Sequence, residues 1–337
     1  MAGRWQRSSR PLAWRLAGVA LVAAALTPSV QAAMPASSGV DCTQLAEEDE
    51  PDSASAWYER SLWASHCYAF QARAVRIGSD GVRALAMSHG IEDGVERERA
   101  RYLDGPAVAF EREGRIARPG GMTSSASSAA PPEAIVEHLD GLYRLQLSGS
   151  DRIAGRHAMR LDIEPLDDQR YGHRLWLDAN TALPLKKMLL DEQGRVIETF
   201  QITDLRAPRL HQGAIDLASP PSLPALSWRP DWLPRGFVPQ AIATQGGRRP
   251  GIEHRVYGDG LSTLSLFVEP LEGRSLLIPG IHRLGVSRAA VMHRELGGRP
   301  CQVVAMGELP SRVLQRVVES VTWQADAQAG ASDADER

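Results

Sequence analysis

Residues 170–178, RYGHRLWLD, hold the densest group of side chains in this sequence that could take part in chemistry. His173 is a residue type that can accept a proton near neutral pH. Arg170 and Arg174 are residue types that bind carboxylate or phosphate groups. The stretch is therefore either a catalytic or anion-binding site, or a strand that carries polar residues, and the elements around it decide between them.

Alternation of apolar and polar side chains places this stretch on a β-strand. One face carries Tyr171, His173, Leu175 and Leu177, and the other carries Arg170, Arg174, Trp176 and Asp178. The same alternation continues over 143–148, 159–164 and 196–202, with Glu198 as an exception on the apolar face. Hairpin turns are predicted at 149–151, 165–169, 179–181 and 191–194. Because no helix separates these strands, we expect an antiparallel meander that curls or is covered.

The strand gives each polar side chain a structural interpretation beside the chemical one. His173 is either a base or a buried interior histidine. Arg170 and Arg174 either pair with carboxylates across neighbouring strands or bind an anionic headgroup. Asp178 is a turn residue. The structural interpretation is favoured for all of them.

Sequence motifs of catalysis are absent. There is no GxSxG, HExxH, GxxxxGK or GxGxxG, and the nine histidines show no metal-ligand spacing. Glu269 ends a strand, and Asp167 and Asp168 sit in a turn, so no paired-carboxylate site is indicated. The sequence therefore favours a binding protein over an enzyme and predicts no catalytic residue, metal ion or cofactor.

The first 32 residues have the pattern of a secretory signal peptide. Four arginines precede an uncharged apolar run, and the small-residue site Val30-Gln31-Ala32 follows. Cleavage after Ala32 removes those arginines and takes the formal charge from −3 to −7. An acidic mature chain gains nothing from the phosphate field of nucleic acid. We therefore expect an exported, soluble protein that does not bind DNA or RNA.

The three cysteines, Cys42, Cys67 and Cys301, show no metal-binding spacing. In an exported protein a Cys42–Cys67 disulfide is possible, and free buried thiols are the alternative. Helices are predicted after Ser53 or Ser55, from Pro132, and from Ser311, where Val313, Leu314, Val317, Val318 and Val321 share one face. The segment 119–132 is of low complexity, and the tail 324–337 is polar, which is typical of disorder.

Residues 151–205, with DRIAGR, RYGHRLWLD and TALPLK in order, resemble the MucB/RseB family of periplasmic sigma-E regulators. The segments SHG, RYLDGPAVAFEREG, WLPRGF, YGDGLSTLSLFVEP and VVAMGELP support the resemblance, which covers about residues 55–323. It implies an α+β fold that is mainly antiparallel β. A half-barrel around helices, similar to the lipoprotein carriers LolA and LolB, would span 41–207. A Pro-rich linker would follow at 208–227, and a smaller sheet-and-helix domain at 228–323.

The resemblance also implies a role in regulation. Family members bind the periplasmic region of a membrane anti-sigma factor of the RseA/MucA type and block its site-one protease, and lipid or lipopolysaccharide relieves the block. Lipid contacts are expected at Tyr143, Leu161, Tyr171, Leu175 and Phe200, and partner contacts at Tyr257, Phe267 and Glu269. A homo-oligomer is possible. The alternative is a periplasmic lipid or lipoprotein carrier of the LolA type, and no motif favours a periplasmic hydrolase.

Overall fold

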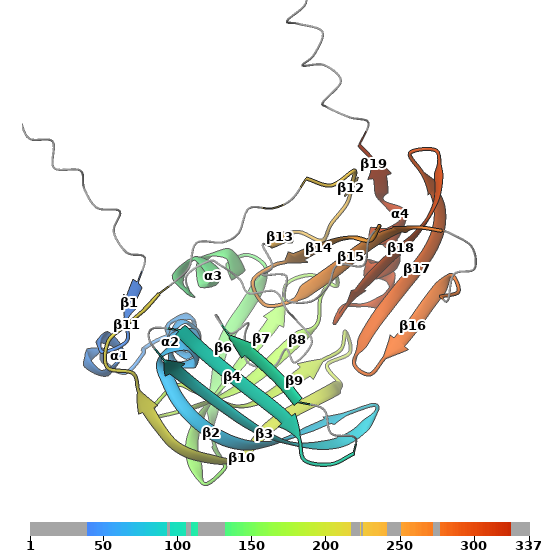
Figure 1. Ribbon diagram of the computed structural model, residues 1–337. Coiled ribbons are helices and arrows are strands. Elements are labelled where there is room, and N and C mark those ends of the chain that lie inside the picture. The colour runs from blue at the N-terminus through green and yellow to red at the C-terminus, as the bar shows by residue number, and fades with distance from the viewer. Residues whose placement is uncertain are drawn as a thin grey trace, which may run out of the picture. The chain divides into compact units, whose positions relative to one another are not determined.

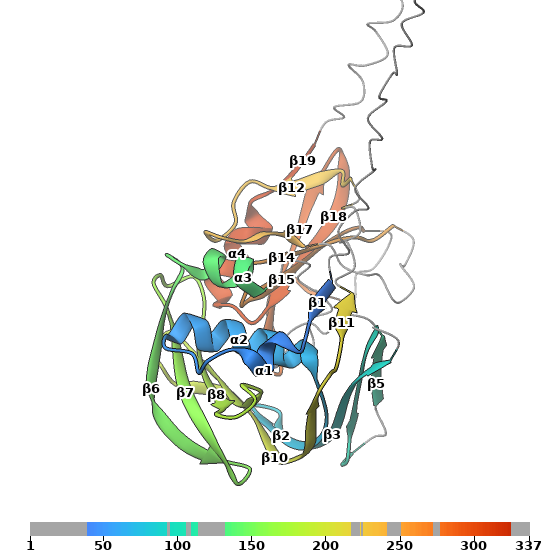
Figure 2. The same cartoon turned by 90° about the vertical axis from the view of Figure 1, so that its left-hand side faces the viewer.

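The predicted meander is part of a nine-stranded antiparallel sheet that curves around a helix in the computed structural model (Figures 1 and 2). The structure describes residues 39–92, 95–105, 109–113, 132–216, 223, 225–240, 251–271 and 277–324. The predicted signal peptide, all of the predicted low-complexity loop except Pro132, and the tail beyond residue 324 lie outside these residues. Among the described residues, no helix is long and apolar enough to cross a membrane.

The strands of the large sheet follow the order β5-β4-β3-β2-β10-β9-β8-β7-β6. They are β2 (Tyr68–Gly78), β3 (Gly81–Glu92), β4 (Val95–Tyr102), β5 (Ala109–Glu113), β6 (Tyr143–Ile153), β7 (Arg156–Pro165), β8 (Gly172–Asp178), β9 (Pro184–Leu190) and β10 (Val196–Leu210). Two meanders, β2–β5 and β6–β10, join where β10 pairs with β2. This curved sheet is called the half-barrel below, and it confirms the predicted mainly antiparallel architecture.

Helices line the inner, concave side of the half-barrel (Figure 2). They are α1 (Gln44–Glu47), α2 (Ala54–Cys67) and α3 (Pro132–Leu139). The predicted helix start after Ser53 is confirmed, because its hydroxyl accepts a hydrogen bond from the Ala56 amide at 3.2 Å. Trp57, Tyr58 and Leu62 of α2 are buried against the inner face of the sheet.

The prediction of a hairpin turn at 149–151 was wrong. Strand β6 continues through these residues with a bulge, and Gly149 takes the positive φ of 100° there. The turn lies beyond the end of β6, at Ala154 and Gly155, which have φ of 51° and 76°. Two positive φ values between paired ends are typical of a type I′ turn, and Ala-Gly lacks the Asn or Asp that usually marks one.

Strand β10 also departs from the prediction, because it runs three residues into the segment expected to be a linker. Pro208 sits in the strand at a register shift between Arg206 and Arg209. A proline can sit there because the bulge does not need its missing N–H. Beyond β10, the short strand β11 (Ala214–Asp216) pairs with β1 (Gly39–Asp41), so part of the predicted linker is also ordered in a sheet.

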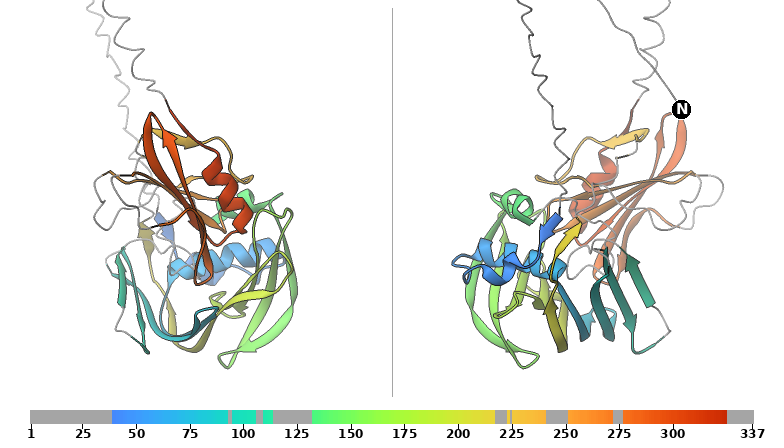
Figure 3. Two further views of the ribbon diagram at one scale, coloured as in Figure 1. Left: turned by 90° about the vertical axis from the view of Figure 1, so that its right-hand side faces the viewer. Right: turned by 60° about the vertical axis from the view of Figure 1, so that its left-hand side comes forward.

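A separate six-stranded sheet occupies the C-terminal part, in the order β13-β14-β15-β18-β17-β16. Its strands are β13 (Val238–Gln240), β14 (Glu253–Gly258), β15 (Thr263–Pro270), β16 (Gly280–Leu284), β17 (Ser287–Leu296) and β18 (Arg299–Gly307). Helix α4 (Ser311–Glu319) packs on one face (Figure 3). The predicted Gly297-Gly298 hairpin is confirmed by positive φ at both residues.

Helix α4 ends earlier than its apolar pattern predicts. Val313, Leu314, Val317 and Val318 are buried as expected. Val321 is also buried, but it belongs to strand β19 (Val321–Trp323), which pairs with β12 (Trp228–Pro230). A Val-Thr-Trp run favours extended backbone, and this preference competes with continuation of the helix.

Candidate functional site

The inner face of the half-barrel is largely filled by the protein's own helices. Leu161 and Leu175 point into a core cluster with Trp57 and Tyr58 of α2, and they are 0% and 6% exposed. Among the residues predicted for lipid contact, these two are therefore packed against protein in this structure. Their burial follows from the same alternation that predicted the apolar face.

The two predicted lipid-contact tyrosines are buried as well. Tyr143 begins β6, and its hydroxyl donates a hydrogen bond to Asp259 at 2.8 Å. Tyr171 packs with Leu189 and with Val286 of the turn between β16 and β17. Burial raises the pKa of the Tyr143 hydroxyl well above its usual range, so this group stays a neutral donor. The structure therefore places both tyrosines in packed contacts.

A half-buried apolar group remains on the inner face where β2, β3 and β10 meet. Phe200, also predicted for lipid contact, belongs to it. Sequence reasoning missed the other members, Phe70, Met87 and Leu205. These four side chains, called the inner apolar group below, pack around small residues such as Ala72 and Ala74. The signal was present in 68–78 as Phe-x-Ala-x-Ala alternation, but small alanines give a weak apolar pattern.

The exception on the apolar face, Glu198, is neutralised by a partner across the sheet. The Arg76 Nε atom lies 2.6 Å from the Glu198 carboxylate, and Arg76 also contacts Asp80 at 3.0 Å. Burial raises the pKa of Glu198, and the Arg76 charge opposes that rise. The pair lets a carboxylate lie on a face that is otherwise apolar.

The polar side chains of residues 170–178 lie in contacts between neighbouring strands and turns. His173 is 2% exposed and lies opposite Ile163 and Leu189 on the neighbouring strands. Arg174 donates to Asp162 of β7 at 2.5 Å, so the predicted cross-strand pairing is confirmed for this arginine. Asp178 is buried, and it accepts hydrogen bonds from Arg156 and Thr181. These contacts hold the hairpins together.

The face of this strand that was predicted to be polar is less polar than expected. Trp176 is only 5% exposed. Its indole N–H donates to Asp151 at 2.6 Å, and the Lys186 ammonium lies 4.6 Å from the ring centroid. Trp176 also belongs to the core cluster that contains Ala72 and Ile202, so its ring packs against apolar side chains while its N–H and ring face pair with polar neighbours.

Arg170 links the half-barrel to the C-terminal sheet. Its guanidinium is fully buried and donates to Asp259 at 2.7 Å and to Asp167 at 2.9 and 3.0 Å. A further bond reaches the Arg235 carbonyl at 2.7 Å. The RYG and YGDG segments, which are far apart in the sequence, therefore meet through one buried ion pair.

The residues predicted for partner contact are split between the two faces of the C-terminal sheet. Tyr257 lies in the core beneath α4 and is 7% exposed. Phe267 and Glu269 alternate with core residues on β15 and so lie on the opposite face. There the Phe267 ring stacks on the His254 ring, with 4.1 Å between the ring centroids, and Glu269 accepts a hydrogen bond from Gln302. Of the three residues, only Phe267 and Glu269 therefore lie on the same face of the sheet.

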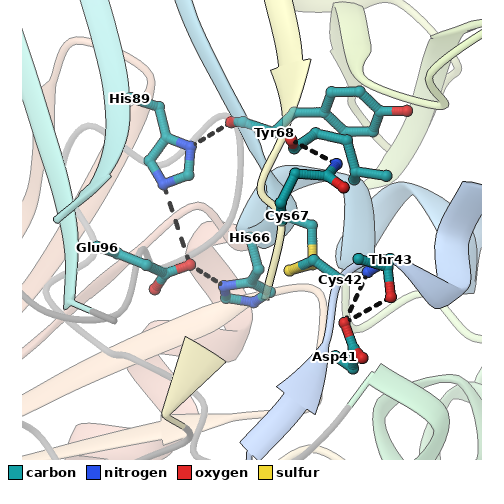
Figure 4. Close-up of a disulfide and its surroundings, with 10 residues drawn as sticks. Asp41, Cys42, Thr43, His66, Cys67, Tyr68, His89 and Glu96 are labelled. Atoms are coloured by element: carbon teal, nitrogen blue, oxygen red, sulfur yellow. Dashed lines mark hydrogen bonds and ion pairs between the residues drawn. A yellow bond between two sulfur atoms is a disulfide. The ribbon is translucent and has the colours of Figure 1, made fainter. Parts of the chain in front are cut away.

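Cys42 and Cys67 are joined in a disulfide, which connects the segment after β1 to the end of α2 (Figure 4). Beside it, Glu96 of β4 lies between two histidines (Figure 4). The Glu96 carboxylate is 2.7 Å from His66 Nδ1 and 4.0 Å from His89 Nε2. Within the described part of the chain, no group of three or more His, Cys, Asp or Glu side chains is arranged to hold a metal ion.

Comparison with known proteins identifies the family to which this chain is similar. Two family models, described as the MucB/RseB N-terminal domain and the MucB/RseB C-terminal domain, match residues 53–222 and 222–322. The sigma factor AlgU regulatory protein MucB of Pseudomonas aeruginosa is 33% identical over 311 residues, which cover 86% of this chain and 95% of that protein. The sigma-E factor regulatory protein RseB of Escherichia coli K12 is 25% identical over 299 residues, covering 78% and 88%.

Solved structures agree with the sequence comparison. The structure of the P. aeruginosa MucA/MucB complex matches with a TM-score of 0.63 and 30% identity, over 81% of this chain and 99% of that chain. A crystal structure of MucB in complex with MucA(peri) matches with a TM-score of 0.61 and 31% identity over the same shares. The half-barrel, the C-terminal sheet and the sequence therefore all lead to one assignment. This chain belongs to the MucB/RseB family.

Proposed function

We propose that this protein is a periplasmic regulator that binds the periplasmic region of a membrane anti-sigma factor of the RseA/MucA type. By covering that region it shields the anti-sigma factor from site-one proteolysis and so restrains an envelope-stress sigma factor. A lipid or lipopolysaccharide signal releases it. The observation that carries the proposal is that the likeness to MucB, which has been solved with MucA, spans both sheets.

Export to the periplasm accords with the signal-like pattern of residues 1–32. The buried Cys42–Cys67 disulfide suits an oxidising compartment. The arrangement of side chains supports binding and not catalysis, because the polar residues of RYGHRLWLD are used to hold strands together. We expect the protein to work without a cofactor.

Lipid would enter at the inner apolar group. Phe70, Met87, Phe200 and Leu205 are half-buried apolar side chains that the helices leave partly uncovered. Acyl chains gain free energy from covering such surface, at about 25 cal/mol per Å². The partner would use the face of the C-terminal sheet that carries Phe267 and Glu269, since the other face is covered by α4.

The test uses the mature chain from residue 33 and the periplasmic segment of the anti-sigma factor of the same organism. Binding is measured by titration, and protection by the rate of cleavage with the site-one protease, each with and without lipopolysaccharide. We expect binding at micromolar concentration or below, slower cleavage, and weaker binding with lipopolysaccharide. Phe267→Ala should weaken binding, while Gln315→Ala, an exposed change on α4 at the other face of the sheet, should not. Absence of binding at micromolar concentration contradicts the proposal.

A lipid or lipoprotein carrier of the LolA type is the second candidate, and the inner apolar group favours it. A carrier would move a lipoprotein between two populations of vesicles. The proposed regulator would not, and it would retain its affinity for the anti-sigma segment. Measuring transfer and affinity on the same preparation separates the two functions.

A further inference from the structure

The turn between β14 and β15 is built as a small rigid unit. Within it, the Leu261 and Ser262 amides both donate to Asp259 Oδ1, at 2.8 and 2.7 Å. The Asp259 amide donates to the Ser262 carbonyl, and Gly260 supplies a positive φ of 96°. Residues 259–262 are called the Asp259 turn below. Since Asp259 Oδ1 closes the turn, Oδ2 can accept hydrogen bonds from residues outside the turn.

The half-barrel holds this turn by polar contacts. Asp259 Oδ2 accepts from Arg170 at 2.7 Å and from the Tyr143 hydroxyl at 2.8 Å. Asp259 and the Arg170 side chain are fully buried, so the ion pair is shielded from water. The Arg170 guanidinium also lies over the Tyr143 ring, 5.3 Å from its centroid. The turn is thus fixed to the start of β6 and to the segment just before β8.

The half-barrel also holds the turn by an apolar contact. Leu261 is 8% exposed and belongs to the same core cluster as Trp57, Leu142 and Leu161. This cluster lies between α2, α3 and the inner face of the half-barrel. The side chain of one residue of the C-terminal sheet therefore completes the core of the half-barrel.

The turn is continuous with the strands of the C-terminal sheet. Thr263, the next residue, begins β15, and the outer face of β15 carries Phe267 and Glu269. We propose that the Asp259 turn is the coupling element through which packing in the half-barrel core is transmitted to the β14–β15 surface. This inference rests on the proposed function, in which lipid at one site changes partner affinity at another. Two sites coupled in this way change each other's affinity by the same factor.

The first test needs neither lipid nor partner. Leu161→Ala opens a cavity in the cluster that contains Leu261, and Leu185→Ala opens one in the neighbouring cluster that does not. Both leucines are 0% exposed, so the two variants are matched in burial. Amide hydrogen exchange is followed at Leu261 and Ser262, whose N–H groups are bonded inside the turn, and along β14 and β15.

We expect Leu161→Ala to speed exchange at these two amides by about tenfold or more, with faster exchange in β14 and β15, and Leu185→Ala to leave them unchanged. If Leu161→Ala does not fold, Leu161→Val gives the same comparison with a smaller cavity. Equal effects of the two positions, or no effect of either Leu161 variant on the turn, would overturn the proposal.

The second test separates this inference from the proposed function. The anti-sigma segment is titrated into wild-type protein and Asp259→Asn, with and without lipopolysaccharide. Loss of the lipopolysaccharide effect in Asp259→Asn, with binding retained, supports the coupling role of the turn. A lipopolysaccharide effect of equal size in both proteins overturns it. If neither protein binds the segment, the proposed function fails, and the hydrogen-exchange comparison still decides whether the turn transmits packing changes.

Discussion

Arg170 Nη1 lies 2.7 Å from Asp259 Oδ2, and both side chains are fully buried. The two residues come from segments that each carry a recognisable pattern, RYG and YGDG. An intact buried pair of opposite charges contributes only modestly to the free energy of unfolding, because removing the two ions from water costs nearly as much free energy as their attraction provides. Removal of one member is costly, since it leaves the other charge in a place that water does not reach.

Arg170→Met is therefore expected to lower the free energy of unfolding by about 3–5 kcal/mol. The double variant Arg170→Met with Asp259→Leu should recover part of that loss, because neither charge remains at the centre of the network. Urea denaturation measures both. Arg144→Met removes an arginine whose pairing with Glu164 is exposed, and a change below about 1 kcal/mol is expected for this control. A loss for Arg170→Met no larger than that of the control would contradict the structural role given to the pair.

The disulfide gives a second prediction. Cys42 and Cys67 are 25 positions apart, and their bond restricts the unfolded chain. Replacing both by Ala should cost about 2–4 kcal/mol of unfolding free energy. Denaturation of the variant and of reduced wild-type protein should agree. Cys301→Ala keeps the disulfide and serves as the control for loss of a buried sulfur. Equal free energies of unfolding with and without the Cys42–Cys67 disulfide would contradict this prediction.

A third prediction concerns pH. Burial lowers the pKa of His89, although its bond to the Tyr68 carbonyl and the Glu96 carboxylate act in the opposite direction. In the unfolded chain a histidine titrates near pH 6.5, so below that value the unfolded state binds more protons than the folded state. The contribution of neutral, buried His89 to the free energy of unfolding is thus fully present above about pH 6.5. It is lost as the pH falls towards the lowered pKa.

Unfolding free energies of wild type and His89→Gln, measured from about pH 8 to about pH 5, should therefore converge as the pH falls. His157→Gln, which removes an exposed histidine, is measured in the same series as the control for a His-to-Gln change. His66 and Glu96 face His89, so the same series on His66→Gln shows whether the neighbouring histidine shares the effect. A wild-type curve parallel to that of His89→Gln counts against the prediction.

A fourth prediction addresses lipid. Phe200→Asp places a charge in the inner apolar group and should weaken binding of a fluorescent acyl probe by about tenfold or more, because burying an unpaired charge is costly. Val196→Asp, on the exposed start of the same strand, should leave binding unchanged. If the two variants bind the probe equally well, acyl chains do not enter beside Phe200.

Much of the fold could be predicted because each strand of the region 143–205 shows its pattern locally. Leu161 and Leu175 alternate with polar residues, and this alone places them on an inner face. The turn at Ala154 could not be placed because alanine rarely adopts a positive φ, and the bulge at Gly149 could not be placed because glycine suits a turn as well as a bulge. The Cys42–Cys67 bond was one of two open alternatives, and spacing alone does not choose between them.

The candidate site was less predictable, because its residues meet only in the folded chain. In the sequence, Tyr143 and Arg170 resemble any other polar residue of a strand. In the structure, both donate hydrogen bonds to Asp259, and nothing in their local sequence indicates this partner. Tyr257 looks like a surface aromatic, but it faces the core because alternation in β14 directs it beneath α4. The inner apolar group escaped notice because two of its neighbours are alanines.

The pairing of β2 with β10 also sets an order of folding. Ile77 lies opposite Thr199, so the β2–β5 meander is synthesised long before the strand that pairs with its inner edge. A chain that emerges from its N-terminus therefore presents an open strand edge until β10 arrives, and such edges promote aggregation. Pairings between distant segments are slow to form. We expect refolding to be limited by the docking of β10, and the yield of folded protein to depend on protecting β2 during that wait.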